Sequence, residues 1–96
     1  MVMHVRPDLV EHANLIRAFT DGQIQAGEFE TSYLRLVKND PVIHGEPAFN
    51  ILDELFYYVD EYFDDPDFTE EESMREQEDL RTHAKEALEK LLRLTD

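Results

Sequence analysis

Apolar residues recur at steps of three and four along most of this chain, and that spacing is typical of amphipathic α-helices. The first series follows Pro7, which a first helical turn tolerates, and stops before Gly22, which can adopt the left-handed conformation that ends helices. Its apolar members are Leu9, Ala13, Ile16 and Phe19. The pattern predicts a first helix over about residues 8–21.

The second series opens with a hydrophobic staple. If Gln25 is the N-cap, Ile24 and Phe29 stand at the two staple positions and can pack over the start of a helix. The pair Asp40-Pro41 ends this helix, because the residue before a proline is disfavoured in the α region. The apolar face between these signals carries Phe29, Tyr33, Leu36 and Val37.

A third series occupies one arc of a helix over about residues 47–63. An acidic run around Pro66 then breaks the helical pattern. The residues that share the apolar arc are Ala48, Leu52, Leu55, Phe56, Val59 and Phe63.

The fourth helix has a clear start but a late apolar stripe. Thr69 and Glu72 have the spacing of a capping box, so this helix is expected to begin at about residue 70. The apolar stripe begins only at Leu80. Residues 70–79 are therefore either a solvated helical segment or a mobile loop.

Short connections between these series favour antiparallel neighbours. No stretch alternates apolar and polar residues for long enough to indicate a strand. The 96 residues suit a single domain spanning 1–96. We therefore predict an all-α, antiparallel up-down four-helix bundle, with helices over about 8–21, 26–39, 47–63 and 70–94.

Charge narrows the function classes. The chain has 23 Asp and Glu against 9 Lys and Arg, a net charge of −14. Between Asp53 and Asp79 there are 13 acids and one base, so about −12 of this charge lies in 27 consecutive residues. Such a segment repels phosphate groups, which argues against binding to nucleic acid or to anionic membranes. The localisation indicates a basic protein partner.

Other features of the composition indicate whether the protein is folded and in which cellular compartment it is expected. With 42% hydrophobic residues the chain is not a disordered acidic tail. It has no cysteine, and no apolar run reaches the length of a signal peptide or a membrane span. A cytoplasmic protein is expected.

The third predicted helix has a polar face beside its apolar arc. At about 100° per residue, Tyr57 falls on the side that carries the acids Asp53, Asp60, Glu61 and Asp64. Tyr58 lies on the other flank, beside Glu54 and Glu61. Two interpretations are open. Tyr58 can be a boundary residue of the core with Tyr57 an ordinary exposed aromatic, or the two can anchor a protein-binding surface surrounded by carboxylates.

Candidate metal and catalytic chemistry is weak. Asp65 and Glu76 have the spacing of positions 1 and 12 of a calcium loop, but Glu70 replaces the glycine that position 6 requires. The histidines form no pair with ligand spacing, so each is expected to be a solitary surface residue: His4, His12, His44 and His83. Glycine-rich phosphate loops and nucleophile motifs are missing. We predict no catalytic residue, no metal and no cofactor.

Three runs of the sequence resemble the bacterial self-protective immunity family typified by the colicin D immunity protein. They are residues 15–29, residues 51–62 and residues 80–91. The most specific part is the block Leu-Phe-x-x-Val-Asp that begins at Leu55. The resemblance extends over about residues 9–94, and the chain is also similar to immunity proteins of contact-dependent inhibition systems.

The resemblance implies a non-enzymatic, acidic helical bundle that binds a cognate toxin domain, typically a tRNA-cleaving RNase, as a 1:1 heterodimer. The immunity protein would cover the basic active-site cleft and mimic the charge of the RNA. Family residues carried over to this chain are Glu54, Asp60, Glu61, Asp64 and Asp65. With the aromatic and neighbouring acidic residues, the predicted toxin-binding surface comprises Asp53, Glu54, Tyr57, Tyr58, Asp60, Glu61, Asp64, Asp65 and Asp67.

Two alternatives remain at this point. Immunity proteins to DNase toxins also use an acidic, tyrosine-bearing helix in a four-helix fold. A general acidic adaptor or nucleic-acid mimic would carry a similar charge.

Overall fold

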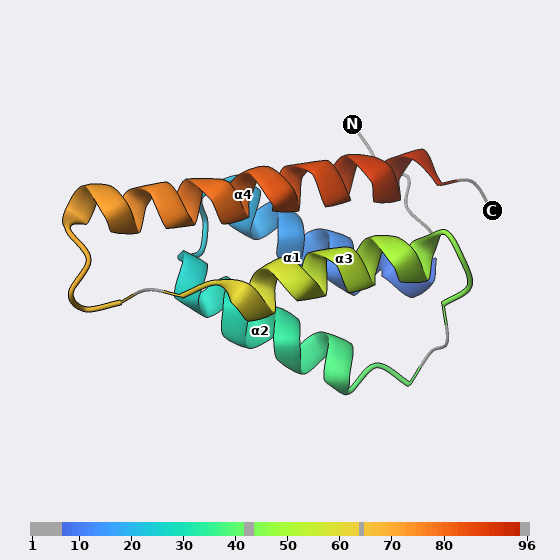
Figure 1. The fold of residues 1–96 in the computed structure, drawn as a ribbon. Coiled ribbons are helices and arrows are strands. Elements are labelled where there is room, and N and C mark those ends of the chain that lie inside the picture. Colours follow the sequence, from blue (N-terminus) through green and yellow to red (C-terminus); the bar gives the residue numbers. More distant parts are fainter. Residues whose placement is uncertain (1–6, 42–43, 64, 95–96) are drawn as a thin grey trace.

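A computed structural model describes residues 7–41, 44–63 and 65–94, and these residues contain helices but no strand. A single 3₁₀ turn, η1, precedes four α-helices (Figure 1). Their bounds are Pro7–Leu9 for η1, Val10–Thr20 for α1, Ala26–Lys38 for α2, Ala48–Glu61 for α3 and Glu70–Arg93 for α4. The predicted all-α four-helix bundle is confirmed.

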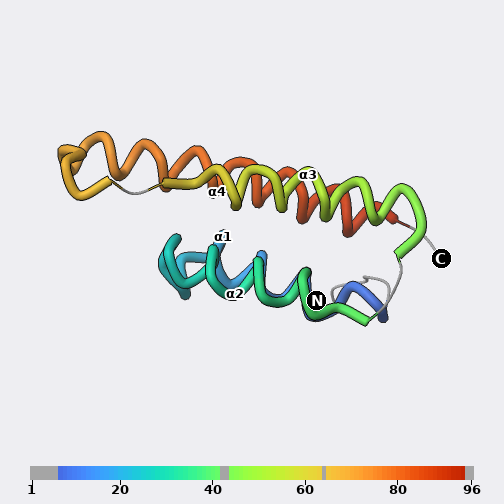
Figure 2. The backbone as a smooth tube through the Cα atoms, turned by 60° about the horizontal axis from the view of Figure 1, so that its bottom comes forward, coloured from blue at the N-terminus to red at the C-terminus, as the bar shows by residue number. Residues whose placement is uncertain are grey.

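Consecutive helices alternate in direction along the bundle, as Figure 1 shows. Both α1 and α3 pack against α2 and α4, so the helices form a closed ring in sequence order. Figure 2 shows the pair α3 and α4 lying over the pair α1 and α2. The arrangement leaves the outer faces of α3 and α4 next to each other.

The core is centred on aromatic residues from α1 and α2. Phe19 and Phe29 stack with ring centroids 4.4 Å apart and planes 10° from parallel, and Tyr33 tilts against Phe29 at 5.5 Å. The Tyr33 hydroxyl donates a hydrogen bond of 3.0 Å to the carbonyl of Leu52, so α2 is tied to α3 through a buried polar group. Burial raises the pKa of Tyr33 well above its ordinary value, and the nearby Asp53 adds to this.

One predicted core residue lies on the surface. Helix α3 ends at Glu61, two residues before the predicted end, because the backbone of Tyr62 is extended with φ −62° and ψ 131°. Phe63 therefore leaves the apolar arc and is 60% exposed.

Gly22 and the capping box act as predicted. Gly22 has a φ of +82°, a conformation that favours glycine, and its amide donates to the carbonyl of Phe19 while that of Gln23 donates to Ala18. At the start of α4, the amide of Glu72 donates to the Thr69 hydroxyl at 3.1 Å and the amide of Thr69 donates to the Glu72 carboxylate at 3.3 Å. Both ends are set by local chemistry.

Residues 70–79 are helical and solvated, which is the first of the two alternatives that the sequence left open. The 24 residues of α4 extend about 36 Å, whereas the 14 residues of α3 extend about 21 Å. The start of α4 projects beyond the ends of the other helices in Figure 1. None of residues 70–79 is buried. We call this segment the α4 extension.

The substitution Thr69→Ala should loosen the α4 extension without unfolding the bundle. Loss of an N-cap costs about 1 kcal/mol, and here it acts on turns that contribute nothing to the buried core. We expect amide hydrogen exchange to accelerate at residues 70–75 while Tm stays within about 2 °C. The variant Thr82→Ala, in the middle of α4, is the control and should leave exchange at 70–75 unchanged. A large fall in Tm for Thr69→Ala would instead make the extension part of the cooperative core.

Candidate functional site

The exposed side of α3 carries the predicted carboxylates. Asp53, Glu54, Asp60 and Glu61 are all exposed, and Tyr57 is 59% exposed among them. We call these five residues the acidic face. The helical periodicity that buries Leu52, Leu55 and Val59 is what turns them outward.

The two tyrosines of α3 have different roles. Tyr58 is half-buried and stacks on His83 of α4, with ring centroids 3.6 Å apart and planes 7° from parallel. Tyr57 contacts the Tyr58 ring edge-on at 5.7 Å. Tyr58 thus lies at the boundary of the core, as the first of the two interpretations expected. Tyr57 is exposed, and its ring contacts the ring of Tyr58.

A groove between α3 and α4 extends the acidic face. Its volume is about 200 Å³, and three of its lining residues are carboxylates from two helices: Glu61, Glu76 and Asp79. The remaining lining residues are Tyr58, Tyr62, Leu80 and His83. We call it the α3–α4 groove. The sequence prediction missed Glu76 and Asp79, although their i, i+3 spacing on a helix places them on one side of α4.

A carboxylate of α2 also lies within the field of the acidic face. Partial burial raises the pKa of Glu30, and the negative charge of Asp60 raises it further. Sequence reasoning could not associate Glu30 with α3, because only the packing of α2 against α3 brings the two charges together.

Removing the charge of Asp60 should therefore stabilise the fold slightly. A carboxyl group whose pKa is raised on folding stabilises the protein below its unfolded-state pKa, and that contribution is lost as the pH rises through the folded-state value. At pH 7 Glu30 is ionised against Asp60, so Asp60→Asn should raise Tm by about 1–2 °C. The gain should vanish on acidification below the ordinary Glu pKa of 4.5, and Glu89→Gln should show no such gain. Differential scanning calorimetry from pH 3.5 to 7 at low salt measures this; a Tm gain that persists at pH 3.5 would contradict it.

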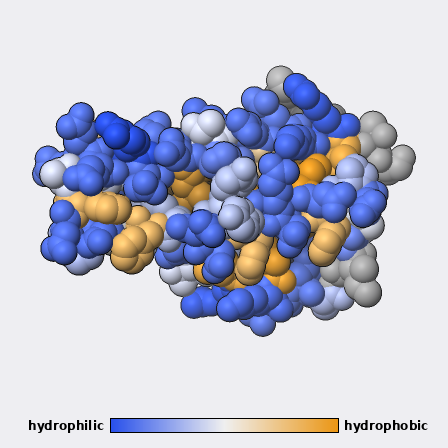
Figure 3. Space-filling model, in the orientation of Figure 1, coloured by the Kyte–Doolittle hydropathy of each residue, from blue (hydrophilic) through white to orange (hydrophobic). Residues whose placement is uncertain are grey.

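The connection after α3 holds the remaining predicted residues. Asp67 is exposed, Asp65 is half-buried, and the Asp65 carboxylate accepts a hydrogen bond of 2.9 Å from the Asp67 amide. The prediction for Asp64 falls outside the described residues. Phe63 contacts Phe68 edge to face at 6.3 Å, and Figure 3 shows apolar side chains among hydrophilic ones at this end of the molecule. Exposed or half-buried phenylalanine rings thus lie in the same connection as Asp65 and Asp67.

Few cations oppose these charges. Lys90 lies 3.8 Å from Glu54, and Arg81 lies 2.7 Å from Glu78. Within the described residues, no ion pair is recorded for the acidic face other than the one at Glu54. The carboxylates of the α3–α4 groove, Glu61, Glu76 and Asp79, therefore add to a surface whose negative charge is little compensated.

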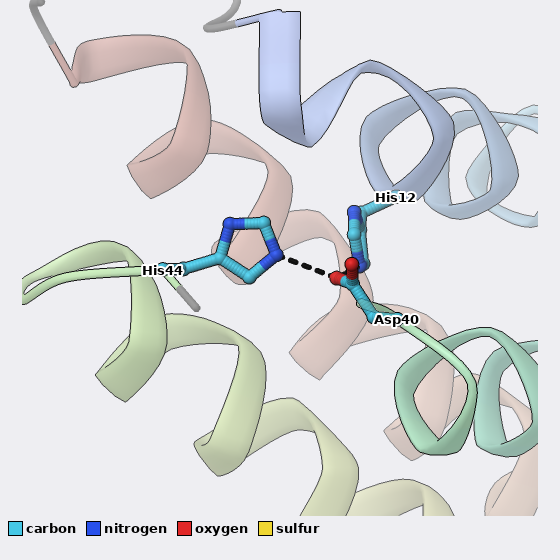
Figure 4. Close-up of side chains that lie close together, drawn as sticks. All are labelled: His12, Asp40 and His44. Atoms are coloured by element: carbon cyan, nitrogen blue, oxygen red, sulfur yellow. Dashed lines mark hydrogen bonds and ion pairs between the residues drawn. The ribbon is translucent and has the colours of Figure 1, made fainter. Parts of the chain in front are cut away.

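The expectation of solitary surface histidines is wrong for two residues. His12 is 2% exposed and His44 is 7% exposed, and both lie against Asp40 (Figure 4). Burial lowers the pKa of His12, which Asp40 offsets only in part. For His44, burial alone would also lower the pKa, but hydrogen bonds to Asp40 and Asp8 outweigh it and the pKa is raised. His83 stacks on Tyr58, and His4 lies outside the described residues.

The structure gives no support to a calcium loop or a membrane span. Residues from Glu70 onward are helical, so the segment from Asp65 to Glu76 cannot form a loop of 12 residues around an ion. In the parts of the chain that the structure describes, no helix has the length and apolarity to cross a bilayer.

Comparison with known proteins identifies the family. Residues 8–91 match the model of the family described as bacterial self-protective colicin-like immunity. Neither the curated proteins nor the solved structures gave a match. The matched residues include α1, α2, α3 and nearly all of α4, and thus the acidic face and the α3–α4 groove. The chain belongs to the bacterial self-protective colicin-like immunity family.

Proposed function

We propose that this protein neutralises a nuclease toxin, most specifically a tRNA-cleaving RNase, by covering its basic active-site cleft with the acidic face and the α3–α4 groove. Family membership supports the coarser statement that it is an immunity protein that neutralises a toxin, and such proteins are not catalysts. The nuclease class, the surface, a 1:1 complex and action in the cytoplasm are our proposals.

The observation that carries the proposal is the concentration of exposed carboxylates on two adjacent helices. A nuclease cleft must be positively charged to hold the phosphates of its substrate. Glu61, Glu76 and Asp79 line the α3–α4 groove together, and Asp60 is exposed next to Glu61 on α3. Such a surface competes with RNA for the cleft and accelerates encounter with it.

Aromatic residues supply the contact energy that exposed charges lack. Exposed ion pairs contribute little each, whereas tyrosine side chains are enriched among the residues that dominate binding energy. Tyr57 has a ring already held against Tyr58, which itself stacks on His83, so less rotational freedom is lost on binding. We infer that Tyr57 is the anchor and that the surrounding carboxylates select a basic partner.

Tyr57→Ala should accelerate dissociation of the toxin complex. Truncation of a central aromatic anchor costs about 2 kcal/mol or more, which corresponds to a dissociation rate about 30-fold higher. Because Tyr57 is 59% exposed, Tm should hardly change. Surface plasmon resonance with the toxin domain measures the rates, and Tyr57→Phe is the matched control that keeps the ring. If Tyr57→Ala left the dissociation rate unchanged, the anchor would lie elsewhere.

The central experiment is co-expression with the toxin domain encoded next to this gene, followed by co-purification and cleavage assays. We expect a stoichiometric complex and full inhibition of tRNA cleavage at equimolar protein. Parallel assays on ribosomal RNA and DNA decide the substrate class, and inhibition by this protein should be competitive with the substrate. Undiminished tRNA cleavage at excess protein, with inhibition of another activity, would overturn the tRNase assignment but not the family.

A further inference from the structure

A cluster at the opposite end of α3 from the connection to α4 is unrelated to the proposed toxin surface. It combines His12 of α1 with Asp40 and His44, which lie between α2 and α3. One nitrogen of each ring and a carboxylate oxygen all lie within 4.8 Å of one another. Figure 4 shows both rings directed at the Asp40 carboxylate.

The distances show that both rings contact the same oxygen of Asp40. The Nε2 atom of His44 lies 2.5 Å from Oδ2 of Asp40, and Nε2 of His12 lies 3.0 Å from the same oxygen. The two rings meet edge to face, with centroids 5.3 Å apart and planes at 89°. Two imidazole nitrogens and one carboxylate oxygen thus converge from two segments of the chain, α1 and the connection between α2 and α3.

The burial of the His12 side chain is not accounted for by hydrogen bonds. Its side chain is buried, yet neither ring nitrogen makes a hydrogen bond with any group that the structure describes. The contact with Asp40 is close but lacks hydrogen-bond geometry. Buried polar groups almost always have a partner, and an ion on Nε2 would give this nitrogen a partner with directed geometry.

His44 is held as metal-binding histidines are. Its Nδ1 atom lies 2.8 Å from the Asp8 carboxylate, which fixes the ring and leaves Nε2 directed toward Asp40 and His12. A carboxylate on the second ring nitrogen is the usual support of a metal-ligating histidine, because it sets the ring orientation and raises the basicity of the ligand.

We propose that Nε2 of His12, Nε2 of His44 and the Asp40 carboxylate bind one divalent ion of the zinc class. Imidazole and carboxylate donors at distances of about 2.0–2.2 Å suit Zn²⁺, whereas Mg²⁺ and Ca²⁺ prefer oxygen donors alone. Donors of a tetrahedral ion are about 3.3 Å apart, and the two nitrogen–oxygen distances of 2.5 and 3.0 Å would lengthen toward that value. The ion replaces the proton between His44 and Asp40, which is released to solvent.

Three protein ligands leave the fourth position for water. A cavity of about 210 Å³ adjoins the cluster and is lined by Val37, Phe49, Leu52 and Asp53 besides the three ligands. The bound ion would tie the loop between α2 and α3 to α1. The effect is structural, and it does not depend on the proposed toxin.

The test begins with wild-type protein freed of metal by EDTA and titrated with Zn²⁺ in millimolar Mg²⁺, which occupies the surface carboxylates. We expect calorimetry to give one ion per chain, a rise in Tm, and proton release. Co²⁺ as a probe should give the ligand-field absorption of a tetrahedral site. Absence of saturable binding would overturn the proposal.

Variants locate the site. His44→Gln should abolish stoichiometric binding, and Asp8→Asn should weaken it about 10- to 100-fold while one ion per chain still binds. His83→Gln is the control and should bind like the wild type. Retained binding by a folded His44→Gln variant would refute the site. Should that variant not fold, ring ¹⁵N spectra of the wild type decide: Zn²⁺ must shift His12 and His44, and shifts confined to His4 or His83 would refute it equally.

Discussion

The double substitution Asp60→Lys/Glu61→Lys is expected to weaken the affinity for a toxin domain by about 10³-fold. The two changes alter the local charge of the acidic face by four units, and like charges facing a basic cleft cost several kcal/mol. Most of this loss of affinity should come from slower association, because electrostatic steering raises association rates by about 10- to 10³-fold. Both residues are exposed, so the helix content and the fold should be retained.

Stopped-flow association at several ionic strengths measures this effect. The wild-type rate should fall steeply with salt, whereas the rate for the double variant should be low and nearly independent of salt. A matched control is Glu46→Lys/Glu89→Lys, which changes the net charge equally at exposed positions outside residues 53–79. If this control slowed association as much, the net charge of the molecule and not the acidic face would guide the partner.

Phe29→Ala is expected to destabilise the protein by about 3–5 kcal/mol, a large part of the stability of a domain of this size. The Phe29 ring is fully buried and is the central member of the aromatic group, stacked on Phe19 and tilted against Tyr33. Its loss leaves a cavity between α1 and α2 that neighbouring side chains fill only partly.

Urea unfolding with and without the substitution measures the difference in free energy. Phe49→Ala serves as the control, because Phe49 is 52% exposed and its truncation should cost no more than about 0.5 kcal/mol. Toxin capture by Phe29→Ala should fall only with the folded fraction, while the rates of the remaining folded molecules should match the wild type. Equal costs for the two phenylalanines would place the core elsewhere.

Local chemistry explains why the fold was predictable from the sequence. The apolar steps that include Leu52, Leu55 and Val59 define a helix and its buried face together. Gly22 and the Thr69 capping box end and start helices through contacts of a few residues. Such signals survive without tertiary context, and the predicted helix ends accordingly differ from the observed ones by two residues at most.

Most of the features that sequence reasoning missed depend on packing between segments that are distant in the sequence. His44 lies only four residues after Asp40, but His12 reaches Asp40 only because α1 approaches the connection between α2 and α3. Glu30 meets Asp60, and Glu76 meets Glu61, through helix packing in the same way. The helical periodicity predicts Phe63 in the core, but α3 ends at Glu61 and Phe63 is exposed.

The projecting start of α4 has a consequence for how such a protein can change over generations. Residues 70–79 contribute no buried side chain, so substitutions there carry little risk for folding. Two of these residues, Glu76 and Asp79, line the α3–α4 groove together with Glu61. Substitutions that would unfold the protein if they occurred in the core are tolerated in this segment. When the sequence of the partner changes, the protein can therefore adapt through side chains that its own folding does not require.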